Sequence, residues 1–285
     1  MTTTDLDAQS LHAAEITKKS RSNFAIAFAT LPKERREAMV TYYAFCRVVD
    51  DIVDEPGPTR DERLRLLDRW RHTVDGKVVT LTAFEQDVVK MQETYSVPAS
   101  EMHLLIDGME KDLDTVRYET FDDLLGYCYH VASSVGFVCM RIFGCDIPAT
   151  QEYAKNLGYC LQLTNIIRDV VDDWEKEERI YIPQEDMDRF ELDDSLFRNG
   201  PENTRFVEMM QFQYERAESY YEKAGEAIPR SQRRRVVATE TMRDTYRAIL
   251  RKMEADKFRV FEKRYRLGRL HKVAILTRRM LASLV

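Results

Sequence analysis

The segment CRVVDDIVDE, residues 46–55, places four acidic residues beside three valines and an isoleucine within ten positions. Carboxylates at this density repel one another, and their burial without a partner costs free energy. The segment is therefore either an exposed helix face whose apolar half packs inward, or a site for a strongly positive group. A second segment, QLTNIIRDVVDDWEKEERIYIP at 162–183, repeats the pattern.

The composition around these segments is that of a helical protein. The 285 residues include only 10 glycines and 8 prolines, which disfavours a β architecture with many turns. A charged fraction of 32% with 44% hydrophobic residues suits amphipathic helices around an apolar interior. We find no strand-like alternation, no internal repeat and no Gly/Ser linker. The sequence predicts a single all-α domain over residues 1–285, of which residues 1–15 form a loose N-terminal tail.

Charge and cysteine usage argue against several classes of protein. A formal net charge of −6 gives no reason to expect a nucleic-acid partner. The five cysteines form no C-x-x-C pair and the five histidines no i, i+4 pair, so zinc is not indicated and the cysteines are interpreted as buried, reduced thiols. The polar, acidic start lacks the features of a secretion signal or transit peptide. No apolar run reaches the ~18 residues of a transmembrane helix, so we expect a cytoplasmic protein.

Helical geometry gathers the polar residues of each acidic segment into one narrow stripe. At about 100° per residue, each stripe covers roughly 60–80° of its helix. The first stripe consists of Tyr43, Arg47, Asp50 and Asp54, and the second of Gln162, Asn165, Asp169 and Asp173. Asp51 and Asp172 are rotated away from these stripes by about 60° or more. We therefore expect the chemistry to use the D-x-x-x-D pair within each segment.

Two aspartates at positions i and i+4 bring their carboxylates close together, and divalent cations would turn this repulsion into binding. Oxygen ligands from Asp and Asn, without thiol or imidazole, suit Mg²⁺ or Mn²⁺. Arg47 and Arg168 lie beside the stripes and can offer paired donors to phosphate. A single D-x-x-x-D is usually a solvated helix face, but two with adjacent arginines predict a site for a metal-bound diphosphate.

The motifs also resemble those of a known family. The segments YAFCRVVDDIVDE (43–55), YCYHVASSVG (127–136) and LQLTNIIRDVVDDWEKEERIYIP (161–183) are similar to signatures of the squalene/phytoene synthases, the head-to-head trans-isoprenyl diphosphate synthases. The resemblance extends from about Ser20 to the terminal helix, with the motifs in family order. It implies an all-α isoprenoid-synthase fold with a central apolar cavity between the two Asp-rich helices.

The resemblance implies roles for individual residues. It implies that metal ions are bound by Asp50, Asp54, Asn165, Asp169 and Asp173, and that Tyr127 joins the four aspartates as a catalytic residue. It implies that the substrate is contacted by Ser20, Arg21, Ser22, Asn23, Tyr43, Arg47, Gln162, Arg168 and Tyr246, and by the pocket-wall residues Ala132 and Gly136. Without the resemblance, Tyr127 is equally explained as a core aromatic residue, and close helix packing is an alternative explanation for Ala132 and Gly136 at positions i and i+4. The sequence departs from the family pattern at SRSN (20–23) and in the spacer before Arg179 and Tyr181, which is one residue longer than usual.

The implied activity is that of a prenyltransferase that condenses two prenyl diphosphates. The motifs are most similar to those of bacterial enzymes that make presqualene diphosphate from farnesyl diphosphate, with phytoene synthase on a C20 substrate as the alternative. Whether NADPH is used stays open, because a glycine-rich dinucleotide motif is absent. A non-catalytic family member that acts as a binding or assembly protein is disfavoured by the intact aspartates. A class I terpene cyclase is disfavoured by its different second metal motif.

The C-terminal segment KRYRLGRLHKVAILTRRMLASLV, residues 263–285, predicts a basic amphipathic helix. The simplest interpretation is a packed terminal helix with a charged outer face. The functional interpretation is weak peripheral contact with anionic lipid at the inner face of a membrane.

Overall fold

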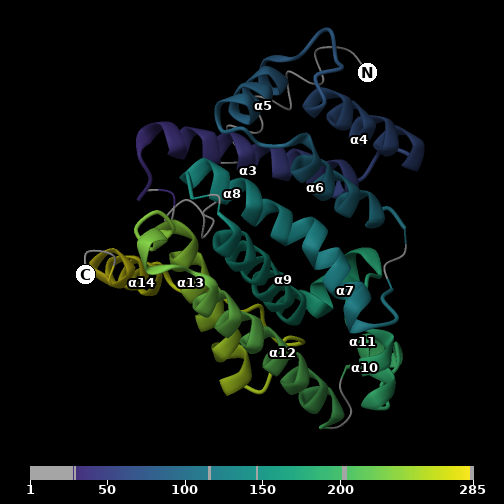
Figure 1. The fold of residues 1–285 in the computed structure, drawn as a ribbon. Coiled ribbons are helices and arrows are strands. Elements are labelled where there is room, and N and C mark those ends of the chain that lie inside the picture. The colour runs from purple at the N-terminus through teal and green to yellow at the C-terminus, as the bar shows by residue number, and fades with distance from the viewer. Residues whose placement is uncertain (1–27, 29, 115–116, 146, 201–203, 283–285) are drawn as a thin grey trace.

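The structure is a computed structural model that describes residues 28, 30–114, 117–145, 147–200 and 204–282 (Figure 1). Within these ranges every regular element is a helix, and an isolated bridge pairs Arg117 with Ile180. The predicted all-α class is thus confirmed. No described helix combines the length and the apolar character needed to cross a bilayer.

Residues 33–111 form four helices whose starts follow local sequence signals. They are α3 (Lys33–Asp54), α4 (Arg60–Val74), α5 (Ala83–Thr94) and α6 (Ala99–Lys111). Pro32 and Pro98 directly precede α3 and α6. Thr59 and Thr82 begin α4 and α5 with capping boxes, in which each threonine hydroxyl accepts a hydrogen bond from the backbone N–H three residues later.

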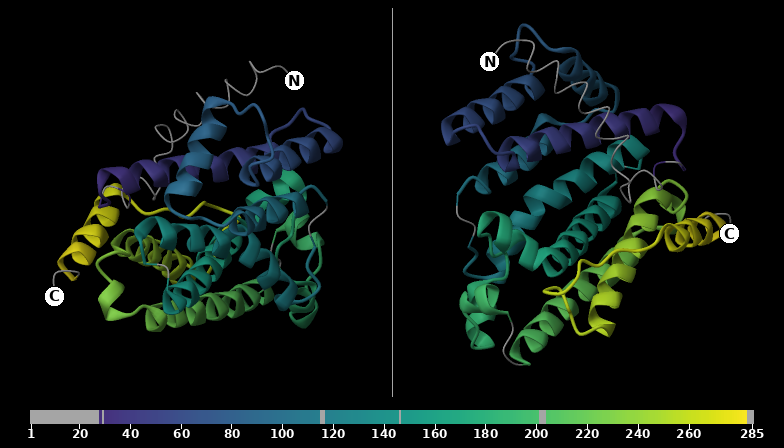
Figure 2. Two further views of the ribbon diagram at one scale, coloured as in Figure 1. Left: turned by 45° about the horizontal axis from the view of Figure 1, so that its top comes forward. Right: turned by 180° about the vertical axis from the view of Figure 1, so that it is seen from behind.

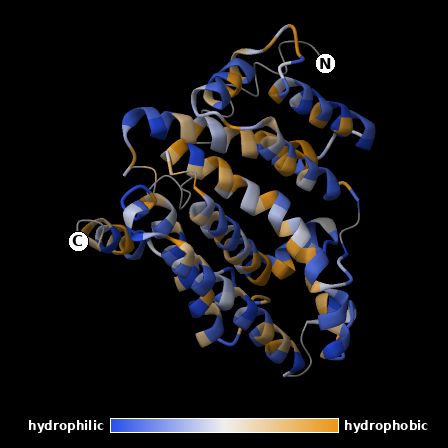
Figure 3. Cartoon of the chain, viewed as in Figure 1, coloured by the Kyte–Doolittle hydropathy of each residue, from blue (hydrophilic) through white to orange (hydrophobic). Residues whose placement is uncertain are grey.

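The central apolar segment forms one continuous helical stretch with a π-helical turn in its middle. Its parts are α7 (Phe121–Cys128), η1 (Tyr129–Ser133) and α8 (Ser134–Phe143). Hydrophobic residues run along α7 and α8 (Figure 3), which suits a helix at the centre of the fold. Gly144 ends α8 in the left-handed conformation, with φ of 67°.

The long helix α9 (Pro148–Glu177) lies against most of its neighbours. It packs against η1 and α8 on one side and along α12 on another (Figure 2). A Cβ atom at Gly158 would lie 2.5 Å from the backbone of Ser133, so only glycine permits this approach of α9 to η1. The remaining helices are α10 (Gln184–Arg189), α11 (Ser195–Asn199), α12 (Arg205–Ala227), η2 (Arg230–Gln232), α13 (Val237–Ala255) and α14 (Arg269–Ala282).

The buried side chains form one hydrophobic cluster that extends from Phe28 to Tyr265. This continuity supports the predicted single domain, which stays a prediction. Four of the five cysteines are buried, Cys46 is partly buried, and all five are free thiols. Burial raises the pKa of Cys139 to about 12, so this thiol stays protonated at neutral pH.

Candidate active site

A cavity of about 210 Å³ lies between α3, the η1–α8 segment, α9 and α13. Its wall is mainly apolar, with contributions from Phe28, Met39, Val131, Leu157, Leu161 and Met242. Six residues predicted for the site line the same cavity: Tyr43, Ala132, Gly136, Gln162, Asn165 and Tyr246. The fold thus brings together residues that the sequence places on four separate helices.

Gly136 serves both the cavity and the packing of its helix. A Cβ atom at this position would lie 3.0 Å from the carbonyl oxygen of Ala154 and 3.1 Å from its Cβ. The missing side chain therefore lets α8 approach α9 closely, and it also leaves space in the cavity wall. The two interpretations of Gly136 from the sequence are compatible.

The first acidic row lies at the C-terminal end of α3 and carries one flanking arginine. Arg47 donates from Nη1 to Asp50 Oδ2 at 2.5 Å and pairs through Nη2 with Asp51 Oδ1 at 2.7 Å. Burial, and then the nearby Asp54 carboxylate, raise the pKa of Asp50 to about 7. This end of α3 therefore carries negative charge that Arg47 compensates only in part.

Arg179 connects the first acidic row to the end of α9. The helix stops at Glu177, Glu178 takes a left-handed conformation with φ of 52°, and the Arg179 N–H bonds to the Asp173 carbonyl at 3.2 Å. The Arg179 side chain then donates to Asp54 Oδ1 at 3.1 Å and to the Asp112 carbonyl at 2.9 Å. The longer spacer before Arg179 thus still delivers the guanidinium to α3.

Asp112 is a buried acid of this region that the sequence analysis missed. The Tyr127 hydroxyl donates to its Oδ2 at 2.8 Å, and the Tyr181 hydroxyl donates to its Oδ1 at 3.3 Å. Burial, opposed by Arg179 and by the Tyr127 hydrogen bond, raises the pKa of Asp112 to about 6. A signal was available, because Asp112 falls on the same helical stripe as the buried Leu105 and Gly108.

Tyr127 belongs to this cluster rather than to the cavity wall. Its ring stacks on that of Tyr181 with the ring centroids 5.3 Å apart, and Tyr118 lies beside both rings. The hydroxyl of Tyr127 reaches Asp112 and thereby connects α7 to the end of α6. The structure therefore places Tyr127 beside a carboxylate of the acidic region, and its catalytic role stays a prediction.

The second acidic row, on α9, is held by two arginines. Arg168 donates from Nε to Asp169 Oδ1 at 2.8 Å. Arg264, which comes from the linker between α13 and α14, pairs with Asp169 Oδ1 at 3.1 Å and with Asp172 Oδ2 at 3.4 Å. Arg264 was also missed, because the sequence predicts a helix that begins at residue 263. That boundary is wrong: α14 begins at Arg269, and residues 263–268 form an irregular linker.

The oxygen atoms of these rows are suitable ligands for a divalent cation. Asn165 Oδ1 is buried at the cavity with no hydrogen-bond partner among the described residues, so it is an acceptor that a cation would satisfy. Asp50 lies near a second carboxylate on its own helix, Asp54. In the described parts of the chain, no three carboxylate, imidazole or thiol groups already converge as a metal cage. Such an open arrangement suits Mg²⁺, which takes few protein ligands and completes its shell with water and phosphate.

Four predicted substrate contacts, Ser20, Arg21, Ser22 and Asn23, lie outside the described residues. The remaining predicted residues lie on the cavity wall, in the acidic rows or, like Tyr127, beside them. Their individual roles stay predictions.

Comparisons with known proteins agree with this geometry. A family model described as squalene/phytoene synthase matches residues 17–271. The chain belongs to the squalene/phytoene synthase family. Members of this family are prenyltransferases that catalyse head-to-head condensation, and in general they use a divalent cation to bind diphosphate.

Relatives within the squalene/phytoene synthase family differ in the product that their names give. A 15-cis-phytoene synthase from Synechocystis is 32% identical over 266 residues, covering 88% of this chain and 78% of that protein. A presqualene diphosphate synthase from Rhodopseudomonas palustris is 33% identical over 260 residues, covering 90% of this chain and 91% of that protein. The crystal structure of a dehydrosqualene synthase in complex with ligand superposes with a TM-score of 0.82 at 28% identity, covering 98% of both chains.

Proposed function

We propose that this family member condenses two molecules of farnesyl diphosphate head to head and forms a presqualene diphosphate-type product. The observation that carries the proposal is the apolar cavity of about 210 Å³ with Tyr43, Gln162 and Asn165 on its wall. The acidic rows lie on α3 and α9, the same two helices that supply these three residues. Such a site holds an apolar prenyl chain in the cavity and the charged diphosphate group at the acidic rows.

The diphosphate heads are assigned to the two acidic rows. Asp50 and Asp54 on α3, with Asn165, Asp169 and Asp173 on α9, would hold Mg²⁺, which neutralises diphosphate charge when it is bound. The guanidinium groups of Arg47 and Arg168 lie beside these carboxylates and can bind phosphate oxygens directly. The binding of a cation by the carboxylates would release both arginines for that contact.

The chemistry needs a departing diphosphate and a protected carbocation. The bond between C1 of one prenyl chain and its diphosphate oxygen breaks, which leaves an allylic cation and inorganic diphosphate. The double bond of the second chain supplies the electron pair for a new carbon–carbon bond, and loss of one proton to the released diphosphate closes a cyclopropane ring. Phe28, Leu157 and Met242 exclude water, and the ring faces of Tyr43 and Tyr246 stabilise positive charge.

Two prenyl diphosphates, with C15 and C20 chains, are the candidate substrates. Farnesyl diphosphate is chosen because the motifs are most similar to those of enzymes that make presqualene diphosphate, and the presqualene diphosphate synthase of Rhodopseudomonas palustris is 33% identical over 260 residues. The second candidate is phytoene synthesis from two C20 diphosphates. It is supported by relatives named phytoene synthase, such as the Mycobacterium tuberculosis protein with 31% identity over 273 residues.

A product assay tests the proposal directly. The purified protein is incubated with Mg²⁺ and either farnesyl or geranylgeranyl diphosphate, with and without NADPH, and the extracted products are separated by mass. We expect a C30 cyclopropyl diphosphate from the C15 substrate without NADPH. Conversion of the C20 substrate alone would overturn the choice of farnesyl diphosphate in favour of phytoene synthesis. Absence of product from both substrates would overturn the catalytic assignment and favour a binding or assembly protein.

A further inference from the structure

Helix α14 exposes an unusual amount of apolar surface. Four of the six large hydrophobic residues that are exposed in the described part of the chain lie on it: Leu270 (88% exposed), Val273 (45%), Met280 (48%) and Leu281 (61%). At about 100° per residue these four side chains fall within an arc of roughly 100° on one face of the helix. The other two, Val79 and Ile147, lie singly elsewhere and need no explanation.

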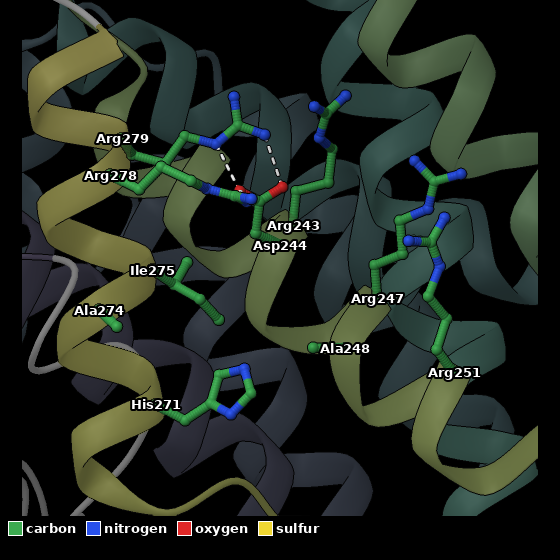
Figure 4. A pocket seen from close by; sticks show the side chains of 10 residues that line it. All are labelled: Arg243, Asp244, Arg247, Ala248, Arg251, His271, Ala274, Ile275, Arg278 and Arg279. Carbon is green, nitrogen blue, oxygen red and sulfur yellow. Dashed lines mark hydrogen bonds and ion pairs between the residues drawn. The ribbon is translucent and has the colours of Figure 1, made fainter. Parts of the chain in front are cut away.

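The opposite face of α14 is fastened to α13, so this exposure is not the result of a detached helix. Ile275 is buried, and Arg279 donates from Nε and Nη2 to the two carboxylate oxygens of Asp244 at 2.6 and 2.5 Å (Figure 4). Arg278 adds a bond to Asp244 at 2.6 Å, and Arg279 also pairs with Glu240 at 2.9 Å. The helix is therefore fixed in one orientation at the edge of the molecule (Figure 1), and its apolar face is exposed.

The segment that carries this face is strongly basic although the whole chain is acidic. Residues 263–282 contain seven lysines and arginines and no acidic residue, whereas the chain has a formal net charge of −6. Arg266, Arg269 and Lys272 have no ion-pair partner among the described residues. Burial, and then the like charge of Arg266, lower the pKa of Lys272. Positive charge near the start of α14 is thus left without a counter-charge from the protein.

A second basic surface adjoins α14. A pocket of about 450 Å³ between α13 and α14 is lined by five arginines, by His271 and by a single carboxylate (Figure 4). The arginines are Arg243, Arg247, Arg251, Arg278 and Arg279. Glu218 accepts hydrogen bonds from Arg247 and Arg251, and Glu240 pairs with Arg243. Arg247 also pairs with Glu222 at 3.7 Å. With Asp244, four acids therefore face five arginines, and one positive charge of the pocket is left without a carboxylate.

We propose that α14 docks the protein on an anionic lipid bilayer. The apolar face of Leu270, Val273, Met280 and Leu281 enters the boundary between headgroups and acyl chains. Arg269 and Lys272 contact the phosphate groups around it, and the arginine pocket beside α13 accepts a lipid headgroup.

Charge complementarity selects a membrane over a second copy of this chain. A symmetric dimer through α14 would bring Arg266, Arg269 and Lys272, which have no ion-pair partner among the described residues, near the same three residues of the second copy, and like charges at an interface oppose association. An anionic bilayer offers both an apolar interior and a negative surface. Helix α14 also packs on α13, whose residues Ala238, Met242 and Tyr246 line the apolar cavity. A bilayer bound to α14 would therefore be separated from this cavity by one helix.

The test measures binding of the full chain to vesicles and requires no substrate, so its outcome is independent of the proposed condensation. Flotation is compared for phosphatidylcholine vesicles with and without phosphatidylglycerol. We expect binding only to the anionic vesicles, weakened by salt. The double variant Leu270→Ser/Leu281→Ser should reduce the partition coefficient at least about tenfold, because apolar burial drives insertion. Val79→Ser, fully exposed on another part of the surface, is its matched control.

A second pair of variants separates charge from apolar burial. Arg269→Gln/Lys272→Gln should weaken binding to the anionic vesicles and flatten its salt dependence, whereas Arg65→Gln on α4 should leave both unchanged. Far-ultraviolet circular dichroism verifies that every variant keeps its helices. No binding of the wild type, or equal binding of the wild type and the leucine variant, would overturn the proposal. A wild-type dimer that the leucine variant converts to a monomer, without vesicle binding, would instead identify α14 as a subunit interface.

Discussion

The acidic rows on α3 and α9 have the same i, i+4 spacing of aspartates but different surroundings. On α3, Asp50 lies near the carboxylates of Asp54, Asp51 and Asp112, and Arg47 is its adjacent cation. On α9, Asp169 is held between Arg168 and Arg264, and the second arginine arrives from the distant C-terminal linker. The spacing in the sequence determines which carboxylates share a face, whereas the tertiary fold determines how much of their charge is already compensated.

The difference in charge compensation suggests that the two helices have different roles in binding the cation and the diphosphate. Burial, and then the neighbouring carboxylates of the α3 row, raise the pKa of Asp50 to about 7, and this excess negative charge favours a bound cation. The row on α9 keeps arginines in place that a diphosphate can use once the carboxylates bind metal. The three predictions that follow test this difference.

The largest expected effect comes from neutralising one aspartate in each row. Asp50→Asn and Asp169→Asn should each lower kcat by roughly 10³-fold, since each removes a charged ligand that supports departure of the diphosphate. Their effects on the metal-free protein should differ in sign. Asp50→Asn removes a buried charge among carboxylates and should raise Tm, whereas Asp169→Asn leaves Arg168 and Arg264 without their common acceptor and should lower it.

The measurements are steady-state turnover with Mg²⁺ and thermal unfolding in EDTA at pH 8. Asp87→Asn, an exposed aspartate on α5, serves as the control and should change neither quantity. Shifts of Tm with the same sign and size in both variants would show that the two rows do not differ in charge compensation.

The second prediction concerns Asp112, whose pKa of about 6 in the folded chain exceeds the usual value of an aspartate. The folded state therefore binds a proton more tightly than the unfolded state between about pH 4 and pH 6. Stability from this group is present below that window and is lost as the pH rises through it. The free energy of unfolding of the wild type should fall by about 3 kcal/mol relative to Asp112→Asn between about pH 4 and pH 7.

Urea unfolding at a series of pH values, with EDTA present, checks this dependence. Parallel curves for the wild type and Asp112→Asn would mean that Asp112 titrates normally and that its burial does not oppose its charge. Tyr127→Phe removes the hydrogen bond to Oδ2 that stabilises the carboxylate, so it should move the transition to higher pH.

The sequence was most informative where function depends on spacing along one helix. The pattern predicted helices across both acidic rows. The cavity gathers Tyr43, Gly136, Gln162 and Tyr246 from four helices, two of which carry these rows. Pro32, Thr59 and Thr82 are local signals of the same kind, and they begin α3, α4 and α5 in the structure. These features depend on the regular geometry of a helix, which a single sequence encodes directly.

The missed residues depend on contacts between distant segments. Arg264 comes from a linker and reaches α9, and Arg179 contacts Asp112 across a separation of 67 residues. No local pattern indicates which of many surface arginines will meet a carboxylate. The π-helical turn of η1 was also missed. One additional residue in a buried turn leaves the hydrophobic pattern of the sequence almost unchanged.

The smallest expected effect separates Arg264 from Arg179. Arg264 is 41% exposed and Arg179 is 13% exposed, so their ion pairs differ in solvent screening. Arg264→Gln should lower kcat/KM about tenfold by removing one charge-assisted contact near the diphosphate, with little change in Tm because exposed pairs add little stability. Arg179→Gln should lower Tm as well, because Asp54 and the Asp112 carbonyl lose a common donor. Arg266→Gln, in the same linker, is the matched control. A wild-type value of kcat/KM in Arg264→Gln would exclude Arg264 from the site, and Arg168 alone would then compensate the charge of Asp169.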